Sequence, residues 1–324
     1  MRPEIVVLST GGTIASTSGA GGATPQKRGA ELVDAVPELE SYANLTVTEV
    51  AHRPSFDMDF ETISALREAV VEAVGDGAAG IVVTHGTDTM EESAYALDLT
   101  LDVEAPVVFT GAQRRPDETS SDGPANLLTA VRLAAHEKLV GEGGVYIAFD
   151  EELHAARDVT KQHTSKLDTF GSPDKGPIAA TTREGVRFFR APGSRSVDIQ
   201  TTEPTASVEM VKSGVGVGAE QITRAVDAGV DGLVIEGTGL GNVTSALGDA
   251  IGDAIDAGVV VVVTSRCSAG AVSGVYGTGG GGATLANHGV VFGGDLPAHK
   301  ARLKLVYALS VGGDHESVAE LFDE

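Results

Sequence analysis

Short apolar runs alternate with amphipathic stretches along most of this chain, and that alternation limits the folds open to it. The clearest run is Gly80-Ile81-Val82-Val83, which predicts a buried parallel strand, and a helical pattern over 91–101 follows it. Further strands are predicted at 4–8, 45–50, 106–109, 144–149, 232–236 and 259–264. The alternation predicts the α/β class, with two doubly wound domains built on mostly parallel sheets.

Polar turns follow two of these strands, at the sheet edge where open α/β folds bind ligands. One is Thr84-His85-Gly86-Thr87-Asp88, in which Gly86 lets the backbone turn sharply off the strand. The other is Thr10-Gly11-Gly12-Thr13, whose glycines permit close backbone approach and can point N–H groups at an oxyanion. The Gly86-Thr87-Asp88 turn alone is more typical of a helix N-cap than of a site, and the Thr10–Thr13 turn alone is a moderate signal of a site. Their combination favours a site.

The stretch from Ser16 to Gly29 has no apolar periodicity. It is either a flexible connection or a mobile lid. We favour the lid because the stretch is long and leaves the candidate site directly after Thr13.

The net charge of −23, from 46 Asp and Glu against 23 Lys and Arg, is the strongest global signal. It argues against nucleic-acid binding, which requires a basic surface. Self-repulsion destabilises a compact acidic chain unless salt screens it, so we predict a halophilic protein. An ordinary acidic bacterial protein is the alternative interpretation.

The apolar runs and the single cysteine indicate the cellular compartment of the protein. No apolar run reaches the roughly 20 residues of a membrane helix, and residues 4–8 form a strand rather than a signal-peptide core. The single cysteine, Cys267, excludes an intrachain disulfide and is expected to pack in the interior. We predict a cytoplasmic protein with no membrane partner.

Two long segments are distinctive: Thr-Gly-Gly-Thr-Ile-Ala at 10–15 and Thr-His-Gly-Thr-Asp-Thr-Met-Glu-Glu at 84–92. In these segments the chain resembles the bacterial-type L-asparaginase/glutaminase family. Shorter matches occur at 121–127, 156–161, 237–242 and 300–302. The resemblance covers essentially the whole chain, in order.

The resemblance implies a role for each catalytic residue. Thr13 takes the place of the primary nucleophile, which attacks the side-chain amide carbon and forms an acyl-enzyme. Thr87, Asp88 and Lys161 take the places of a second triad, in which the lysine polarises the threonine. The chemistry is reasonable without the name, because a lysine desolvated beside a carboxylate and a hydroxyl can accept a proton.

Substrate binding is implied in the same way. Ser55 and Asp88 match positions that hold the α-carboxylate and α-amino groups of the substrate. Gly12, Gly86 and Thr87 are also predicted to bind the substrate. Asn242 matches a residue directed towards the active site of a neighbouring subunit. The resemblance therefore implies a homodimer or homotetramer with its sites at the dimer interface.

Three departures from the family pattern concern substrate contacts. Relatives carry a tyrosine in the lid, but 16–29 contains none, so the group that activates Thr13 stays open. A polar position after Ser55 is Phe56, and no Glu lies between Glu236 and Glu316 to match one that relatives supply from the second subunit. Glutaminase side activity stays open, since one methylene changes binding by only about 1–3 kcal/mol.

Other chemistry-bearing residues receive structural interpretations. His85 is expected to be a structural histidine, and no metal or cofactor is predicted, because His154 and His163 lack metal-ligand spacing. The breakers around Pro192 and Pro204 predict an N-terminal catalytic domain at 1–190, a linker at 191–207 and a smaller C-terminal domain at 208–324.

The predicted function is hydrolysis of L-asparagine to L-aspartate and ammonia. One alternative is the asparaginase-like subunit of a tRNA-dependent amidotransferase. That subunit normally has an extra N-terminal domain, whereas here a strand begins at residue 4, and the acidic charge suits tRNA poorly. The other alternative is a non-catalytic amino-acid-binding protein, which would not need the hydroxyl and lysine chemistry.

Overall fold

The computed structural model describes residues 2–19, 22–25, 27–193, 196, 198–201 and 203–323. The chain divides into two units, Met1–Asp198 and Ile199–Glu324. Parts of the predicted lid (20, 21 and 26) and of the predicted linker (194, 195, 197 and 202) lie outside the described residues.

An eight-stranded sheet forms the centre of the first unit, among the residues that the structure describes. Its order is β12-β11-β8-β7-β6-β5-β1-β4, and the five strands from β7 to β4 are parallel. The strands are β1 (Glu4–Gly11), β4 (Asn44–Arg53), β5 (Gly80–Thr84), β6 (Val107–Thr110), β7 (Val145–Phe149), β8 (Glu152–Ala155), β11 (Ala179–Thr182) and β12 (Gly185–Phe188). The parallel, mostly β-branched strands confirm the predicted α/β class.

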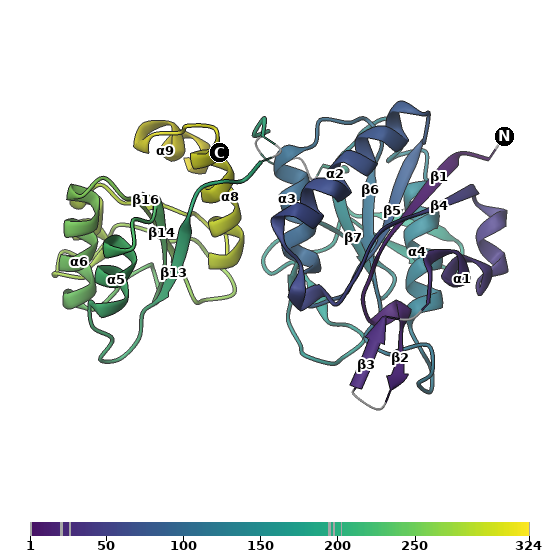
Figure 1. Ribbon diagram of the computed structural model, residues 1–324, viewed down its shortest axis with the longest axis horizontal. Helices are drawn as coiled ribbons and strands as arrows, with labels where there is room; N and C mark the ends of the chain where they lie inside the picture. Colours follow the sequence, from purple (N-terminus) through teal and green to yellow (C-terminus); the bar gives the residue numbers. More distant parts are fainter. Residues whose placement is uncertain are drawn as a thin grey trace. The chain divides into compact units, whose positions relative to one another are not determined.

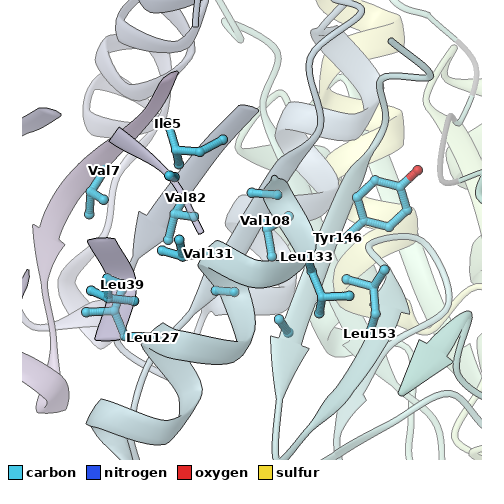
Figure 2. Close-up of a cluster of buried hydrophobic side chains, with 14 of the residues drawn as sticks. Ile5, Val7, Leu39, Val82, Val108, Leu127, Val131, Leu133, Tyr146 and Leu153 are labelled. Carbon is cyan, nitrogen blue, oxygen red and sulfur yellow. The ribbon is translucent and has the colours of Figure 1, made fainter. Parts of the chain in front are cut away.

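Helices cover both faces of this sheet (Figure 1). The helices α2 (Phe60–Gly75) and α3 (Met90–Thr100) lie on one face, and α1 (Gly29–Asp34) and α4 (Gly123–Ala134) lie on the other. Buried aliphatic side chains fill the space under α4, with Val82 and Val108 of the sheet against Val131 of the helix (Figure 2). This core fixes the strand ends from which the site is built.

Several short elements had no clear sequence signal. The strands β8, β11 and β12 extend the sheet in antiparallel fashion, and β9 (Thr160–Lys161) pairs with β10 (Phe170–Gly171). The predicted lid begins as an ordered hairpin, since β2 (Ser16–Gly19) pairs with β3 (Gly22–Pro25). Strands of two or four residues are too short to show a period, and these lack the continuous apolar run that marked the four-residue β6, so pattern reasoning could not find them.

The second unit contains a parallel sheet of order β13-β14-β15-β16 within its described residues. Its strands are β13 (Val208–Lys212), β14 (Gly232–Gly237), β15 (Val260–Ser265) and β16 (Val291–Phe292). Its helices are α5 (Glu220–Asp227), α6 (Ser245–Asp256), α7 (Gly282–His288), α8 (Ala298–Ser310) and α9 (His315–Asp323). None of the described helices in either unit combines the length and apolar character needed to cross a bilayer.

One packing prediction for this unit is wrong. Cys267 is exposed rather than interior, because it lies in the turn that follows β15 and not on the strand itself. The apolar run ends at Val263, and the chain then passes through Ser265 and Arg266 towards solvent.

Candidate active site

The site lies where the strand order of the first sheet reverses. In the parallel part, β1 lies between β4 and β5, so successive strands are added on opposite sides of β1. Ser9 and Thr84 are register partners at the carboxyl ends of β1 and β5. Open α/β sheets bind ligands at such a switch point, because the loops leaving the two strands diverge and open a crevice.

Two glycines bring the loops together above this point. Gly12 has a φ of +83°, and a Cβ there would lie 2.3 Å from the Gly86 nitrogen. A Cβ on Gly86 would in turn lie 2.5 Å from the Ser55 Oγ. No side chain larger than hydrogen is compatible with these separations, so both positions require glycine. The contact holds Thr13 and Thr87, the residues after the two glycines, on either side of the junction.

The N–H of Gly12 is not available to a substrate. It donates to the Arg53 carbonyl at 3.2 Å, where β1 and β4 end. The sequence suggested this N–H as an oxyanion donor, and the structure shows that it is already paired. What Gly12 contributes is the close approach of the two turns.

Three polar side chains form a hydrogen-bonded network beside this junction. The Lys161 Nζ donates to the Thr87 Oγ1 at 2.9 Å and to the Asp88 Oδ1 at 2.7 Å. Thr87 is buried and the Lys161 side chain is only 14% exposed, whereas the Asp88 side chain is 56% exposed. The threonine hydroxyl therefore has a nearly buried ammonium partner, while the carboxylate faces an open space that a charged ligand can enter.

Ser55 ties the loop after β4 to the same turn. It begins a short 3-10 helix (Ser55–Asp57), and its Oγ accepts the Asp88 N–H at 3.2 Å. The Thr89 hydroxyl donates to the Ser55 carbonyl at 2.6 Å. Ser55 is thus held beside Asp88, and its own hydroxyl proton remains able to donate to a carboxylate.

Glu91 contacts the strand that carries Lys161, and the sequence analysis gave it no role. It is buried in the first turn of α3, and its Oε1 accepts the Lys161 N–H at 3.1 Å and the Thr160 hydroxyl at 3.3 Å. The strand that carries Lys161 is therefore bound to the helix that follows Thr87 and Asp88. The available signal was the position of Glu91 inside the Thr-His-Gly-Thr-Asp-Thr-Met-Glu-Glu segment, three residues after Asp88.

A pocket of about 350 Å3 opens over this network. The predicted site residues that line it are Gly12, Thr13, Ser55, Thr87, Asp88 and Lys161. Its other lining residues are Ser16, Pro54, Phe56, Gln113, Arg115, Glu118 and Thr164. Gly86 lies beneath it as part of the glycine contact. Asn242 belongs to the second unit, where its Oδ1 accepts the Gly282 N–H at 3.0 Å.

His85 precedes Gly86 in the turn, and its ring is uncharged near neutral pH. Burial lowers its pKa to about 4, so the ring is neutral near neutral pH. Its Nδ1 lies 2.7 Å from the Gly86 carbonyl oxygen, and the ring packs against Phe109. His85 therefore supports the turn and carries no charge into it.

Among the described residues, no group of three or more His, Cys, Asp or Glu side chains could hold a metal ion. The chemistry available is that of two hydroxyls, an ammonium group and a carboxylate, which is a set suited to acyl transfer.

Comparison with known proteins identifies the family. Residues 4–194 match the asparaginase N-terminal domain, and residues 207–322 match the glutaminase/asparaginase C-terminal domain. The chain belongs to the asparaginase family. It is accordingly a hydrolase that acts on an amide.

Individual relatives of this asparaginase-family chain carry two kinds of name. A probable periplasmic L-asparaginase of Haemophilus influenzae is 35% identical, over 99% of this chain and 93% of its own length. A subunit of the glutamyl-tRNA(Gln) amidotransferase of Halobacterium salinarum is 39% identical, over 98% of this chain and 78% of its own length. The crystal structure of a probable cytoplasmic L-asparaginase from Campylobacter jejuni superposes with a TM-score of 0.89 at 30% identity, covering both chains completely.

Proposed function

We propose that this pocket hydrolyses L-asparagine to L-aspartate and ammonia through an acyl-enzyme on Thr13. The Thr13 Oγ1 attacks the side-chain amide carbon, its proton passes to the departing nitrogen, and ammonia leaves. Water then attacks the ester carbon, which releases L-aspartate and returns the proton to Thr13. Both steps balance without any further reactant.

The hydrogen-bonded group of Thr87, Lys161 and Asp88, in one pocket with Thr13, carries this proposal. The pocket offers two hydroxyls, one of them already bound by a nearly buried lysine. A solvated surface lysine would not be held at 2.9 Å from a buried threonine and at 2.7 Å from a carboxylate. Such an arrangement is suited to moving a proton during attack or during water activation.

Asp88 and Ser55 suit the ends of an α-amino acid. The exposed carboxylate of Asp88 can pair with an α-ammonium group, and the Ser55 hydroxyl can donate to an α-carboxylate. The two groups are adjacent because the Asp88 N–H donates to the Ser55 Oγ. We propose that they orient the substrate so that its side-chain amide faces Thr13.

Ammonia release from L-asparagine and L-glutamine tests the proposal. Thr13→Ala should abolish turnover, whereas Thr13→Ser should retain a measurable rate because it keeps the hydroxyl. Acid quenching during turnover should trap an aspartyl ester on the wild-type chain and none on Thr13→Ala. Undiminished turnover by Thr13→Ala would refute the assignment of the nucleophile.

The amidotransferase relatives favour a second candidate, in which the chain releases ammonia for a partner enzyme. The observation is the 39% identity to the amidotransferase chain of Halobacterium salinarum. The two candidates differ in their need for the partner. An isolated chain that turns over L-asparagine at a typical enzymatic rate, of about 1–1000 per second, supports the free-standing enzyme. Turnover only in the presence of a partner amidotransferase chain and its tRNA would support the second candidate.

We propose further that the chain acts as a homodimer or homotetramer with sites at the dimer interface. The support is the family itself and the location of Asn242 in the second unit, in a turn after β14. Sedimentation at several protein concentrations tests it, and a monomer with full activity would refute it. The cytoplasmic location stays a prediction.

A further inference from the structure

Lys161 is carried by a ribbon that is too short to hold its own position. The ribbon consists of β9 and β10, which pair in antiparallel fashion with Lys161 opposite Phe170 and Thr160 opposite Gly171. Within the described residues these two strands form a sheet of their own, apart from the eight-stranded sheet. A two-stranded ribbon is marginally stable at best in water. The position of Lys161 therefore depends on the groups that fasten this ribbon to the rest of the first unit.

Two of these groups act on the β10 side of the ribbon. The Phe170 ring packs edge-on against Phe149 of β7, with 5.0 Å between the ring centroids. Directly after β10, the Ser172 Oγ lies 2.9 Å from the Nδ1 of His154 on β8. Both contacts tie β10 to the eight-stranded sheet. Neither of them involves β9, the strand that carries Lys161.

Glu91 fastens β9. It lies buried in the first turn of α3, three residues after Asp88. Its Oε1 accepts the Lys161 N–H at 3.1 Å and the Thr160 hydroxyl at 3.3 Å. Hydrogen bonds to a carboxylate are strong, and little water competes for a buried acceptor. One oxygen of Glu91 therefore holds both residues of the strand against the start of α3.

Lys161 is thus attached at both of its ends to one short segment, residues 87–91. Its ammonium donates to the Thr87 Oγ1 at 2.9 Å and to the Asp88 Oδ1 at 2.7 Å. At the other end of the residue, the backbone N–H donates to Glu91. A lysine has a flexible four-carbon stem, so fixing its backbone limits the positions that the ammonium can occupy. The Glu91 contact therefore bears on the distance between the Lys161 Nζ and the Thr87 hydroxyl.

We propose that Glu91 is a positioning residue for Lys161, which holds β9 so that the ammonium stays within hydrogen-bond distance of Thr87. The kinetic part of this inference rests on the proposed function. Without the Glu91 carboxylate, β9 loses these bonds to α3, and the Lys161 Nζ shifts with the strand. Since a misplacement of about 1 Å can cost about 100-fold in rate, we expect Glu91→Ala to lower kcat for L-asparagine about 10-fold to 100-fold.

The loss should appear in kcat more than in KM. The groups proposed to hold the substrate are Ser55 and Asp88, and their mutual hydrogen bond does not involve Glu91. Glu91→Gln keeps an acceptor oxygen at the same reach, so its kcat should stay within about threefold of wild type. Glu68→Ala removes an exposed carboxylate on α2 in the same unit and should have the wild-type kcat. A kcat for Glu91→Ala equal to that of Glu68→Ala would overturn the proposal.

A double-mutant cycle separates positioning of Lys161 from general damage to the fold. In Lys161→Met the ammonium is gone, so adding Glu91→Ala should lower kcat by less than about twofold further. If the two losses instead multiply, Glu91 acts independently of Lys161, and the proposal is overturned.

Chemical labelling tests the position of Lys161 without reference to activity. Reductive methylation with formaldehyde and dimethylamine–borane, followed by mass spectrometry, measures how readily each lysine reacts. In wild type, the nearly buried Lys161 should react more slowly than the exposed Lys166. Glu91→Ala should raise the rate at Lys161 about fivefold or more and leave the rate at Lys166 unchanged. Equal Lys161 rates in wild type and in Glu91→Ala would overturn the proposal.

Glu91→Asp provides a second variant should Glu91→Ala not fold, because it keeps the charge and withdraws the oxygen by one methylene. It should raise the labelling rate of Lys161 and lower kcat, each by about threefold or more. Wild-type values of both quantities would overturn the proposal. If wild type turns over no amide, the proposed function fails, and labelling still decides whether Glu91 positions Lys161.

Discussion

Substituting alanine for Gly12 tests whether the glycine contact sets the geometry of the site. The new Cβ would lie 2.3 Å from the Gly86 nitrogen and 2.4 Å from its Cα. Both are backbone atoms, so no side-chain rotation relieves the overlap. Real Cβ contacts are essentially never shorter than 3.0 Å, so the two turns must separate by roughly 0.7 Å or more. Gly77 provides a matched control, because it has a φ of +101° and a Cβ there would meet nothing within 4 Å.

The two alanine variants share one cost and differ in another. Each places a Cβ on a residue with positive φ, a conformation that L side chains rarely adopt and that costs about 1–3 kcal/mol. Only Gly12→Ala adds the steric overlap, and overpacking of this kind typically costs about 1–3 kcal/mol. We therefore expect Gly12→Ala to lose about 1–3 kcal/mol more free energy of unfolding than Gly77→Ala.

Activity should distinguish the variants more sharply than stability does. Separation of the turns moves Thr13 away from Thr87, and a misplacement of about 1 Å can cost about 100-fold in rate. Urea unfolding and ammonia release, measured on both variants, check the two expectations. Equal unfolding free energies for the two variants, with kcat/KM of Gly12→Ala at the wild-type level, would refute the reasoning.

Three further predictions concern charge. Lys161→Met should lower kcat for L-asparagine by about 100-fold to 10,000-fold. Lys166 is exposed in the same region, so Lys166→Met should have the wild-type kcat. Similar rates for the two variants would contradict the proton-transfer role of Lys161. Burial lowers the pKa of His85 to about 4 in the folded chain, so as the pH falls the unfolded chain binds this proton first. Through this group, wild type should lose about 2 kcal/mol of free energy of unfolding between about pH 7 and pH 5. Urea titrations should show a smaller loss for His85→Gln, and an equal loss would exclude His85 as the source. The charge of −23 predicts a higher melting temperature in about 2 M than in about 0.1 M KCl, because screening shortens the range of repulsion; a melting temperature independent of KCl would argue against salt adaptation.

The parts of the site that follow strand ends could be predicted from sequence. Thr13 and Thr87 each come directly after a glycine turn at the end of a buried apolar strand, and such turns in parallel strands meet at one edge. That Thr13 and Thr87 lie near each other therefore follows from the fold class alone. Lys161 was different, because its two-residue strand has no readable pattern, and only the family resemblance separated it from a surface lysine.

Hydrogen-bond partners distant in sequence could not be predicted. The pairing of Asp117 with Ser18 depends on the placement of two loops, and the pairing of Gly12 N–H with the Arg53 carbonyl depends on where β4 ends. Neither leaves a spacing or a residue pattern in the sequence. The antiparallel strands β8, β11 and β12 were missed because each has only four residues and, unlike β6, no continuous apolar run.

The two halves of the site are positioned by different means, and this has consequences for mutation. Thr13 and Thr87 follow adjacent strands, so the strand spacing of about 4.8 Å and the glycine contact fix their separation. Lys161 lies outside the parallel sheet, and its strand is bound to α3 through Glu91. Damage to the sheet should therefore impair every step of the reaction together. Loss of the Glu91 carboxylate should act on Lys161 while leaving the Thr13–Thr87 geometry in place, because the glycine contact is made by backbone atoms of the two turns themselves.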